Sequence, residues 1–414
     1  MIDLGKLEQV VLDQKASFGR AARGLDRDVN FNSYLKNDHI TIISGLRRSG
    51  KSTLLRQFAD RLADFHYLNF DDERLLRFDY QDLDQLLIVF KKYSDSKNIL
   101  FDEVQNVAYW ERFIRRLHDD GYKLFITGSN AKLLSSELAT HLTGRYLKLE
   151  LYPFSFKEYL HFYNVDPYDR NTNNIAQILK YFDSFNDNGS IPLSLVGNSD
   201  DILKQIYEDI IYRDIIIRFN VKKSKSFREV ALYVHSNFGC EFSYGDIAKM
   251  LGFKSSTSVK DYLGFLEESY LTFTISKYDY SLKKQFLSNK KAYLIDNGIQ
   301  KSISFRFMEN SGRLLENTVF LELKRRNKEI YYHKAKKQSD FITRVGNKIV
   351  EAIQVTQVMD AHNKDREIGG LIDAMQTYKL KEGLILTVNQ QDEFTKDGYR
   401  IKLLPIYEWL LNKE

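Results

Sequence analysis

The feature that most constrains this chain is a glycine-bounded loop, GLRRSGKS, at residues 45–52. It fits the pattern G-x-x-x-x-G-K-[ST] and stands between an apolar run predicted as a buried strand (39–45) and an amphipathic run predicted as a helix (51–65). In such a loop the glycines allow backbone N–H groups to curl around phosphates, and the helix N-terminus adds a favourable dipole. We therefore predict a phosphate-binding loop for ATP, formed by Gly45, Arg48, Ser49, Gly50, Lys51, Ser52 and Thr53.

A second motif, ILFDE at residues 99–103, is an apolar strand that ends in two acids. An acidic pair at the end of a strand can also be a solvated terminus. Here the pair follows the phosphate-binding loop by about fifty residues, which favours the Mg²⁺ site of a nucleotide hydrolase. We expect Ser52 and Asp102 to hold Mg²⁺ and Glu103 to act as the general base that polarises the attacking water.

Two further residues are candidates for a catalytic role. The strand-like run LFITGSN (124–130) ends in Thr127, Ser129 and Asn130. A polar side chain at this point, for which we take Asn130, can orient water against the γ-phosphate; a simple strand-ending turn has the same composition. Arg145 can stabilise the charge that develops on the transferred phosphate, supplied in trans by a neighbouring subunit, or it can be an ordinary surface arginine.

The composition is that of an ordinary globular protein, with 43% hydrophobic and 28% charged residues. At about 150 residues per domain, a length of 414 residues predicts several domains. The only cysteine, Cys240, excludes an internal disulfide and a multi-cysteine zinc site. The chain starts without a signal-peptide pattern, and no apolar run approaches the ~18–20 residues that span a bilayer. We expect a soluble, cytoplasmic protein with no membrane partner.

The order of apolar patterns predicts an α/β fold class with three domains. Residues 1–220 alternate strand-like and helical runs, as in a P-loop domain with a parallel sheet and a helical extension. Residues 221–300 contain three helical runs followed by two strands joined by a basic stretch, which is typical of a winged helix-turn-helix. Residues 301–414 begin with a helix and continue as strands with one further helix, a second α/β layer.

The positive charge of the chain is concentrated in one segment. Residues 221–338 contain 22 basic residues against 12 acidic ones, whereas the rest of the chain has 39 against 44. This surplus favours double-stranded DNA as a partner, or it is a solvated basic face without a partner. If DNA binds, the second helix of the pair enters the major groove and the wing follows the backbone. The candidate contacts are Lys254, Ser255, Ser256, Thr257, Ser258, Lys260, Lys283 and Lys284, with Lys290 and Lys291 beside the wing.

At this point the chain resembles a known family. Its matching segments, spread from about residue 36 onward, are GLRRSGKSTLL, ILFDEVQ, LFITGSN, HLTGRYLKLELYPFSFKEYL, IYEDIIYRD, SYGDIAKMLGF, KAYLIDNGI, GRLLENTVFLEL and SDFI. They are similar to those of the predicted AAA+ ATPases of bacteria and archaea whose C-terminal half is a domain of unknown function related to PD-(D/E)XK nucleases. The resemblance implies an AAA+ core, a winged helix and a nuclease-like module.

The resemblance fails at the nuclease site that it implies. Such a site needs an acid on the first helix, an aspartate on one strand and Glu-x-Lys on the next, because two carboxylates hold Mg²⁺ and the lysine acts on the attacking water. Glu316 matches the helix acid and Asp340 the strand aspartate, but Gln354 and Thr356 stand at the Glu-x-Lys positions. Glutamine offers only a neutral oxygen and threonine carries no positive charge. We therefore expect a degenerate module that is used for binding or regulation and has no nuclease activity.

These observations predict a Mg²⁺-dependent ATPase of the AAA+ class that couples its nucleotide state to DNA binding through the winged helix and the degenerate nuclease-like module. Two other functions stay open. One is a nucleotide-dependent switch that acts on a protein partner without DNA. The other is an ATP-regulated, metal-dependent nuclease, which Glu316 and Asp340 permit and the missing Glu-x-Lys argues against. The sequence also leaves an oligomer possible.

Overall fold

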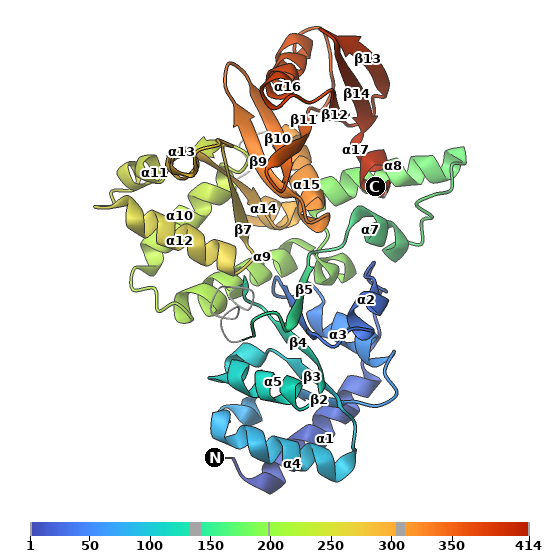
Figure 1. Ribbon diagram of the computed structural model, residues 1–414, viewed down its shortest axis with the longest axis vertical. Coiled ribbons are helices and arrows are strands. Elements are labelled where there is room, and N and C mark those ends of the chain that lie inside the picture. Colours follow the sequence, from blue (N-terminus) through green and yellow to red (C-terminus); the bar gives the residue numbers. More distant parts are fainter. Residues whose placement is uncertain (1, 132–141, 198, 304–310, 413–414) are drawn as a thin grey trace. The chain divides into compact units, whose positions relative to one another are not determined.

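The computed structural model describes residues 2–131, 142–197, 199–303 and 311–412 of the chain (Figure 1). The chain divides into two compact units. The first comprises Met1–Tyr152 with the short segment Glu268–Tyr270, and the second comprises Pro153–Glu267 with Leu271–Glu414. No helix in these described ranges is long and apolar enough to cross a membrane.

The first unit is built on a five-stranded parallel sheet with the order β2-β3-β4-β1-β5. Its strands are β1 (Ile40–Gly45), β2 (His66–Asn69), β3 (Asn98–Asp102), β4 (Lys123–Gly128) and β5 (Tyr146–Leu151). The first four are the strands that the sequence predicts, whereas β5 was not predicted. In a parallel sheet all carboxyl ends lie at one edge, so the loops after β1, β3 and β4 converge there.

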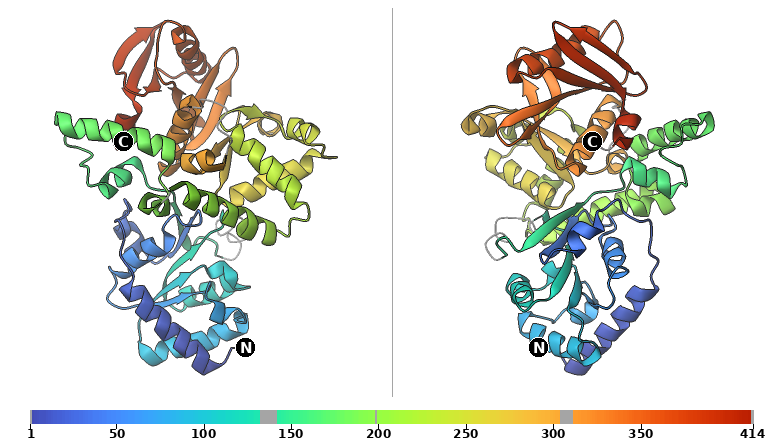
Figure 2. Two further views of the ribbon diagram at one scale, coloured as in Figure 1. Left: turned by 180° about the vertical axis from the view of Figure 1, so that it is seen from behind. Right: turned by 45° about the vertical axis from the view of Figure 1, so that its right-hand side comes forward.

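Helices cover both faces of this sheet, as the ribbon shows from several sides (Figures 1 and 2). They are α1 (Leu4–Arg20), α2 (Phe31–Leu35), α3 (Lys51–Ala59), α4 (Leu83–Tyr93) and α5 (Trp110–Asp119), with 3₁₀ turns η1 (Glu73–Leu75), η2 (Tyr80–Asp82) and η3 (Val104–Asn106). Ile43 packs in one core with Leu54 and Phe58 of α3, and its neighbour Ile42 packs in the other core with Leu86 of α4. Successive strand residues point to opposite faces, so a doubly covered sheet needs the continuous apolar runs seen in the sequence.

The second unit begins with a helical segment. Its elements are α7 (Phe156–Phe162), α8 (Thr172–Asn188), the 3₁₀ turn η5 (Pro192–Val196), α9 (Ser199–Asp209) and the π-helical turn η6 (Ile210–Ile217). Helix α7 starts with a capping box, in which Ser155 accepts from the backbone of Glu158 and the Glu158 carboxylate accepts from the backbone of Ser155.

This helical segment groups with the second unit, so the observed division falls after Tyr152 and not at the predicted residue 220. The reason lies in α14 (Asn297–Ile303), which packs on α8 and α9. Asn297 donates to the carbonyl oxygen of Asn186 over 2.7 Å, and the Asp296 carboxylate accepts from the backbone N–H of Ser190 over 2.7 Å. These buried bonds tie residues more than 100 positions apart.

Four helices and a small sheet follow in the second unit. They are α10 (Ser224–Ser236), β6 (Glu241–Phe242), α11 (Tyr244–Met250), α12 (Ser256–Glu268), β7 (Thr272–Ser276), α13 (Leu282–Leu287) and β8 (Lys290–Leu294). The sheet has the antiparallel order β6-β8-β7, one strand more than the two expected. As predicted, Ser243 caps α11, accepting from the backbone N–H of Asp246 over 3.0 Å.

The last part of the second unit is a six-stranded mixed sheet with the order β13-β14-β12-β11-β10-β9. In chain order its elements are α15 (Ser311–Arg325), β9 (Glu329–Lys334), β10 (Gln338–Val345), β11 (Lys348–Val355), α16 (Lys364–Tyr378), β12 (Glu382–Thr387), β13 (Asp392–Lys396), β14 (Tyr399–Pro405) and α17 (Ile406–Leu411). Strands β9 to β11 pair antiparallel, and β12 pairs parallel with β11 and β14.

Candidate nucleotide-binding site

The phosphate-binding loop joins β1 to α3, the context that the sequence predicts. A Cβ on Gly45 would lie 2.2 Å from the carbonyl oxygen of Leu151, so no larger residue fits beside β5. Gly50 caps α3 with a φ of 95°, a left-handed conformation that L side chains rarely adopt. The backbone thus turns tightly into the helix, and Ser49 is buried within the turn while Arg48 is exposed.

Lys51 is the first residue of α3 and its side chain is only 5% exposed. Its ammonium donates to the loop carbonyls of Gly45 and Leu46 over 3.3 and 3.1 Å and lies 3.8 Å from a carboxylate oxygen of Glu103. The loop and β3 therefore bring the predicted phosphate-binding lysine and the predicted base together, although they stand about fifty residues apart in the sequence.

Asp102 lies at the carboxyl end of β3 and is 1% exposed. It accepts hydrogen bonds from the hydroxyls of Thr127 and Ser52. Burial raises the pKa of Asp102 and the nearby Glu103 raises it further, while the two hydroxyls and Lys51 oppose this. The two residues predicted as metal ligands, Ser52 and Asp102, are thus in contact, and a hydroxyl beside a carboxylate is an oxygen donor set that suits Mg²⁺.

Glu103 follows Asp102 in a left-handed conformation, with a φ of 51°. Its backbone N–H donates to the Thr127 hydroxyl over 3.0 Å, and its carboxylate accepts from the amide of Gln105. Burial raises the pKa of Glu103, but Lys51, Gln105 and Arg47 outweigh this effect and leave the pKa below its ordinary value. The carboxylate is therefore ionised at neutral pH, as a general base must be.

Thr127 is the residue through which β4 organises this site. Its hydroxyl contacts both Asp102 and the backbone of Glu103, and it is completely buried. Of the three polar residues that end this strand, we selected Asn130 as the candidate, which is also buried but lies two residues beyond the end of β4. The strand-ending signal identified the correct edge of the sheet, and the register between β3 and β4, in which Phe101 is paired with Ile126, places Thr127 beside Asp102.

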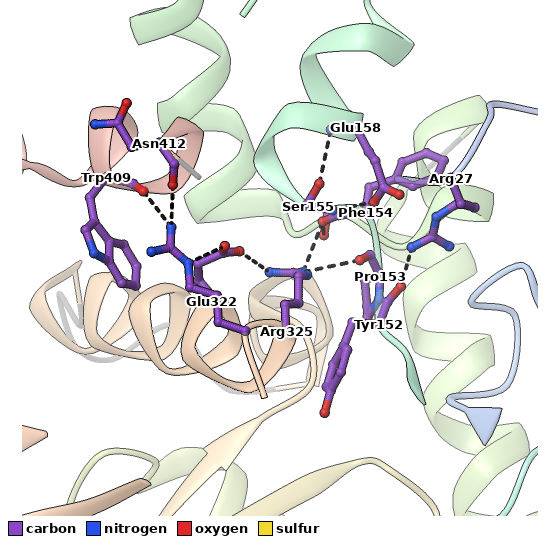
Figure 3. A network of polar contacts seen from close by, with 12 residues as sticks. Arg27, Tyr152, Pro153, Phe154, Ser155, Glu158, Glu322, Arg325, Trp409 and Asn412 are labelled. Atoms are coloured by element: carbon purple, nitrogen blue, oxygen red, sulfur yellow. Dashed lines mark hydrogen bonds and ion pairs between the residues drawn. The ribbon is translucent and has the colours of Figure 1, made fainter. Parts of the chain in front are cut away.

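Two arginines near the loop were not among the predicted residues. Arg47 is half-buried, and its charge helps to lower the pKa of Glu103. Arg27 is 7% exposed and donates to the carbonyl oxygens of Ser49 and Tyr152 over 3.0 and 2.8 Å (Figure 3). No sequence signal marks Arg27, because it precedes the loop in a segment without a recognisable motif.

Arg145 lies just before β5, where its guanidinium is 3.2 Å from the carboxylate of Asp119 at the end of α5. Both side chains are partly exposed, at 33% and 49%. In the first unit this arginine thus belongs to a surface ion pair, and its role in trans stays a prediction.

Most of the predicted DNA-contacting residues lie at the surface. Lys254, Ser255, Ser256, Thr257 and Lys260 at the start of α12 are exposed, Ser258 is half-buried, and Lys283 and Lys284 on α13 are exposed. Lys290 and Lys291 correct the expectation: both are buried, at 7% and 2% exposure. Lys290 donates to Ser276 and Gln285, and Lys291 is paired with carboxylates, so neither side chain is available to a DNA backbone.

The predicted degenerate nuclease residues also come together, around Lys291. Its ammonium is 2.9 Å from Glu316 and 3.6 Å from Asp340. Gln354 donates to Glu367 of α16 over 2.7 Å, and Thr356 donates to the carbonyl oxygen of Val358 over 3.3 Å. No group of three or more acidic, histidine or cysteine side chains within the described ranges is arranged to hold a metal ion.

Comparison with known proteins agrees with the candidate nucleotide-binding site. The AAA domain family matches residues 37–160, which contain the loop, Asp102 and Glu103, and a domain of unknown function (DUF8612) matches residues 193–308. The first unit therefore carries an AAA-type ATPase domain, the nucleotide-binding class that its motifs predict.

The whole chain has relatives in an archaeon and a bacterium. It is 35% identical over 426 residues to the uncharacterized protein MJ1544 of Methanocaldococcus jannaschii, covering 98% of this chain and 95% of that protein. It is 33% identical over 393 residues to an uncharacterized protein of Haemophilus influenzae, covering 90% and 94%. The chain belongs to the same family as these two proteins.

Solved structures are more distant. The replication initiator DnaA, in a structure with AMPPCP and single-stranded DNA, is 17% identical over 57% of this chain and 86% of that chain, with a TM-score of 0.26. A similarity with so low an identity and TM-score supports no conclusion about the fold or the ligands of the present chain.

Proposed function

We propose that the protein binds Mg·ATP at the loop 45–52, hydrolyses it, and couples its nucleotide state to binding of double-stranded DNA. The observation that carries the first part is the meeting of Ser52, Asp102 and Glu103 around Thr127 and Lys51. Phosphate binding, metal binding and base catalysis require these groups to lie within reach of one another. A loop with a purely structural role has no such requirement.

Each side chain has a defined part in this proposal. The N–H groups of the loop and the ammonium of Lys51 bind the phosphates, and Ser52 and Asp102 hold Mg²⁺, which when bound neutralises charge on the phosphate oxygens. Glu103, ionised beside Lys51, accepts a proton from the attacking water. Thr127 fixes the Asp102 carboxylate and the Glu103 backbone at the same time.

Support for a winged helix comes from the chain order α10-β6-α11-α12-β7-α13-β8, in which α13 lies in the connection between the two wing strands, and from the antiparallel sheet order β6-β8-β7. In such a module α12 is the helix that enters the major groove, and its N-terminal Lys254, Ser256 and Thr257 are exposed. Burial lowers the pKa of Lys290, and the charge of Lys260 lowers it further. The exposed lysines of α12 and α13 are therefore suited to follow a phosphate backbone.

Support for the nuclease-like module comes from the order α15-β9-β10-β11-α16-β12 and from Glu316 and Asp340 meeting at one site. Its chemistry is not that of a nuclease, because Gln354 and Thr356 supply neither the third carboxylate nor the catalytic lysine. We propose that the module serves the winged helix as a scaffold.

The test is ATP hydrolysis with Mg²⁺, with and without duplex DNA, at low and moderate salt. Stimulation by DNA that fades with salt supports the proposal, because phosphate contacts release counterions. Hydrolysis that ignores DNA keeps the ATPase and replaces DNA with a protein partner, which nucleotide-dependent capture of that partner would then identify. Absence of hydrolysis despite ATP binding contradicts the enzymatic part.

A further inference from the structure

A buried lysine stands between two acids in the second unit. Lys291 is the second residue of β8, and its side chain is 3% exposed. Its ammonium donates to Glu316 over 2.9 Å and lies 3.6 Å from Asp340. When the amide of Gln338 is turned to satisfy both of its ends, its oxygen accepts from the same ammonium over 3.1 Å. Three oxygens thus surround the ammonium: those of Glu316 and Gln338 lie at hydrogen-bond distance, and that of Asp340 lies at ion-pair distance.

The two carboxylates are held from other sides as well. Glu316 accepts from the hydroxyl of Tyr293 over 2.6 Å, and Asp340 accepts from the backbone N–H of Val355 over 3.0 Å. Burial and the nearby Glu316 raise the pKa of Asp340 to about 7, although Lys291 opposes the rise. The ammonium of Lys291 already balances the charge of one carboxylate, and the raised pKa of Asp340 reduces the charge of the other. Little negative charge is therefore left for a second cation to neutralise.

The position that would supply a third ligand is also occupied. Gln354 accepts from the backbone N–H of Asp340 over 3.3 Å and donates to Glu367 over 2.7 Å. Glu367 is in turn paired with Arg366. The fit to a divalent cation therefore fails twice: an ammonium fills the space between the acids, and the nearest further carboxylate has its own counter-charge.

We propose that Lys291 takes the place of a divalent cation between Glu316 and Asp340, so that this site binds no metal and instead fastens β8 to α15 and β10. A second link runs parallel to it, since Glu241 of β6 is 2.7 Å from Lys334 of β9. The three-stranded sheet and the six-stranded sheet are thereby joined by buried and half-buried charge pairs. The C-terminal module is a charge-locked scaffold and not a metal-dependent nuclease.

The proposal predicts that removing the lysine creates a cation site. A cavity of about 930 Å³, lined by Glu316, Asp340 and Gln354 among others, gives access to the acids. Mn²⁺ binding to the nucleotide-free full chain is measured calorimetrically, with thermal unfolding in parallel, in a Ser52→Ala background that removes one of the two predicted metal ligands of the nucleotide site. We expect Lys291→Ala to bind Mn²⁺ at least ~tenfold more tightly than its parent and to melt at a higher temperature when Mn²⁺ is added.

The matched control is Lys290→Ala. This neighbouring lysine is also buried but is bonded to the Ser276 hydroxyl and the Gln285 carbonyl, not to a carboxylate, so its loss should leave Mn²⁺ affinity unchanged. Adding Asp340→Asn to Lys291→Ala should abolish the gained affinity. A folded Lys291→Ala protein with no gain in Mn²⁺ affinity overturns the proposal.

A further comparison needs no change at Lys291 and stands even if Lys291→Ala does not fold. The parent chain and its Asp340→Asn variant should have the same weak affinity for Mn²⁺. Tight Mn²⁺ binding by the parent that Asp340→Asn removes would show that metal displaces the ammonium, and it would overturn the proposal.

Discussion

Arg27 donates a hydrogen bond from its guanidinium to the carbonyl oxygen of Ser49 over 3.0 Å, so a residue 22 positions before Ser49 holds the phosphate-binding loop in place. The other arm of the same guanidinium bonds to Tyr152 at the end of the first unit. In the second unit, Arg325 bonds to the next two carbonyls, those of Pro153 and Phe154, over 3.2 and 3.1 Å (Figure 3). Three successive carbonyls are thus held by two arginines.

Arg27→Met should weaken ATP binding without changing the chemistry. A buried hydrogen bond to a charged donor contributes about 1.5–3 kcal/mol, so we expect the Kd for ATP to rise ~10- to 100-fold while the turnover of bound ATP changes little. Arg56→Met is the matched control, because Arg56 also donates to backbone carbonyls, those of Phe18 and Ala22, but not to the loop. Equal effects of the two changes on ATP affinity would contradict a specific role for Arg27.

Glu103→Gln should separate binding from hydrolysis. The amide retains the size of the side chain but cannot accept a proton from water, so turnover should fall by ~10²–10⁴-fold. ATP should still bind, because the loop and Lys51 are unchanged. Filter binding and phosphate release measure the two quantities, and a variant that hydrolyses ATP at the parental rate would show that another group is the base.

Thr127→Val should lower turnover, because it removes the hydroxyl that contacts both Asp102 and the Glu103 backbone while keeping the shape of the side chain. We expect a loss of at least ~tenfold, consistent with one or two buried hydrogen bonds. Thr127→Ser restores the hydroxyl and should restore most of the activity. If valine and serine behave alike, the hydroxyl has no part in the site.

Asp296 should make stability depend on pH. It is fully buried, and burial raises its pKa to about 6 despite backbone N–H donors from Ser190, Gly298 and Ile299. The folded protein therefore keeps this proton above the pKa of the unfolded chain, so the contribution is complete below about pH 4 and is lost as the pH rises through about 6.

The measurement is the free energy of unfolding of the parent and of Asp296→Asn between pH 4 and pH 7. The parent should lose up to about 3 kcal/mol relative to the variant across this window, since each unit of pKa shift corresponds to about 1.36 kcal/mol. A difference between the two proteins that does not vary with pH would show that Asp296 is ionised throughout.

Lys254→Ala and Lys260→Ala should each reduce the salt dependence of duplex binding. Both lysines are exposed, Lys254 two residues before α12 and Lys260 on α12, and each lost phosphate contact lowers the slope of log K against log salt by about 0.9. Lys180→Ala on α8 removes an equally exposed lysine outside the segment from α10 to β8 and should leave the slope unchanged. Identical slopes for all three variants would place the DNA elsewhere or exclude it.

The edge of the sheet that carries the candidate nucleotide-binding site was largely predictable from the sequence. The loop residues are contiguous, and Asp102 and Glu103 end an apolar strand, so two local motifs locate the site. The strand-ending signal included Thr127 but did not mark it as the residue beside Asp102, and Arg27 was not predicted, because their roles depend on the register between β3 and β4 and on the path of the N-terminal segment. Neither leaves a local pattern.

Strand β5 and the lysine pair of β8 show a second limit. Lys148 and Glu150 interrupt the apolar run of β5, so its sequence pattern does not predict a buried parallel strand. Lys290 and Lys291 read as part of an exposed basic wing, but β8 is the central strand of its sheet and packs beside α15. Which charges are buried depends on contacts between distant segments, and composition alone does not specify them.

The central claim is that nucleotide state controls DNA binding, and Glu103→Gln allows a direct measurement because it should hold ATP without hydrolysing it. The affinity of this variant for a labelled duplex is measured with Mg·ATP and with Mg·ADP at the same salt. We predict affinities that differ by ~tenfold or more, because a ligand shifts an equilibrium only through different affinities for its states. Equal affinities in ATP and ADP would contradict the coupling.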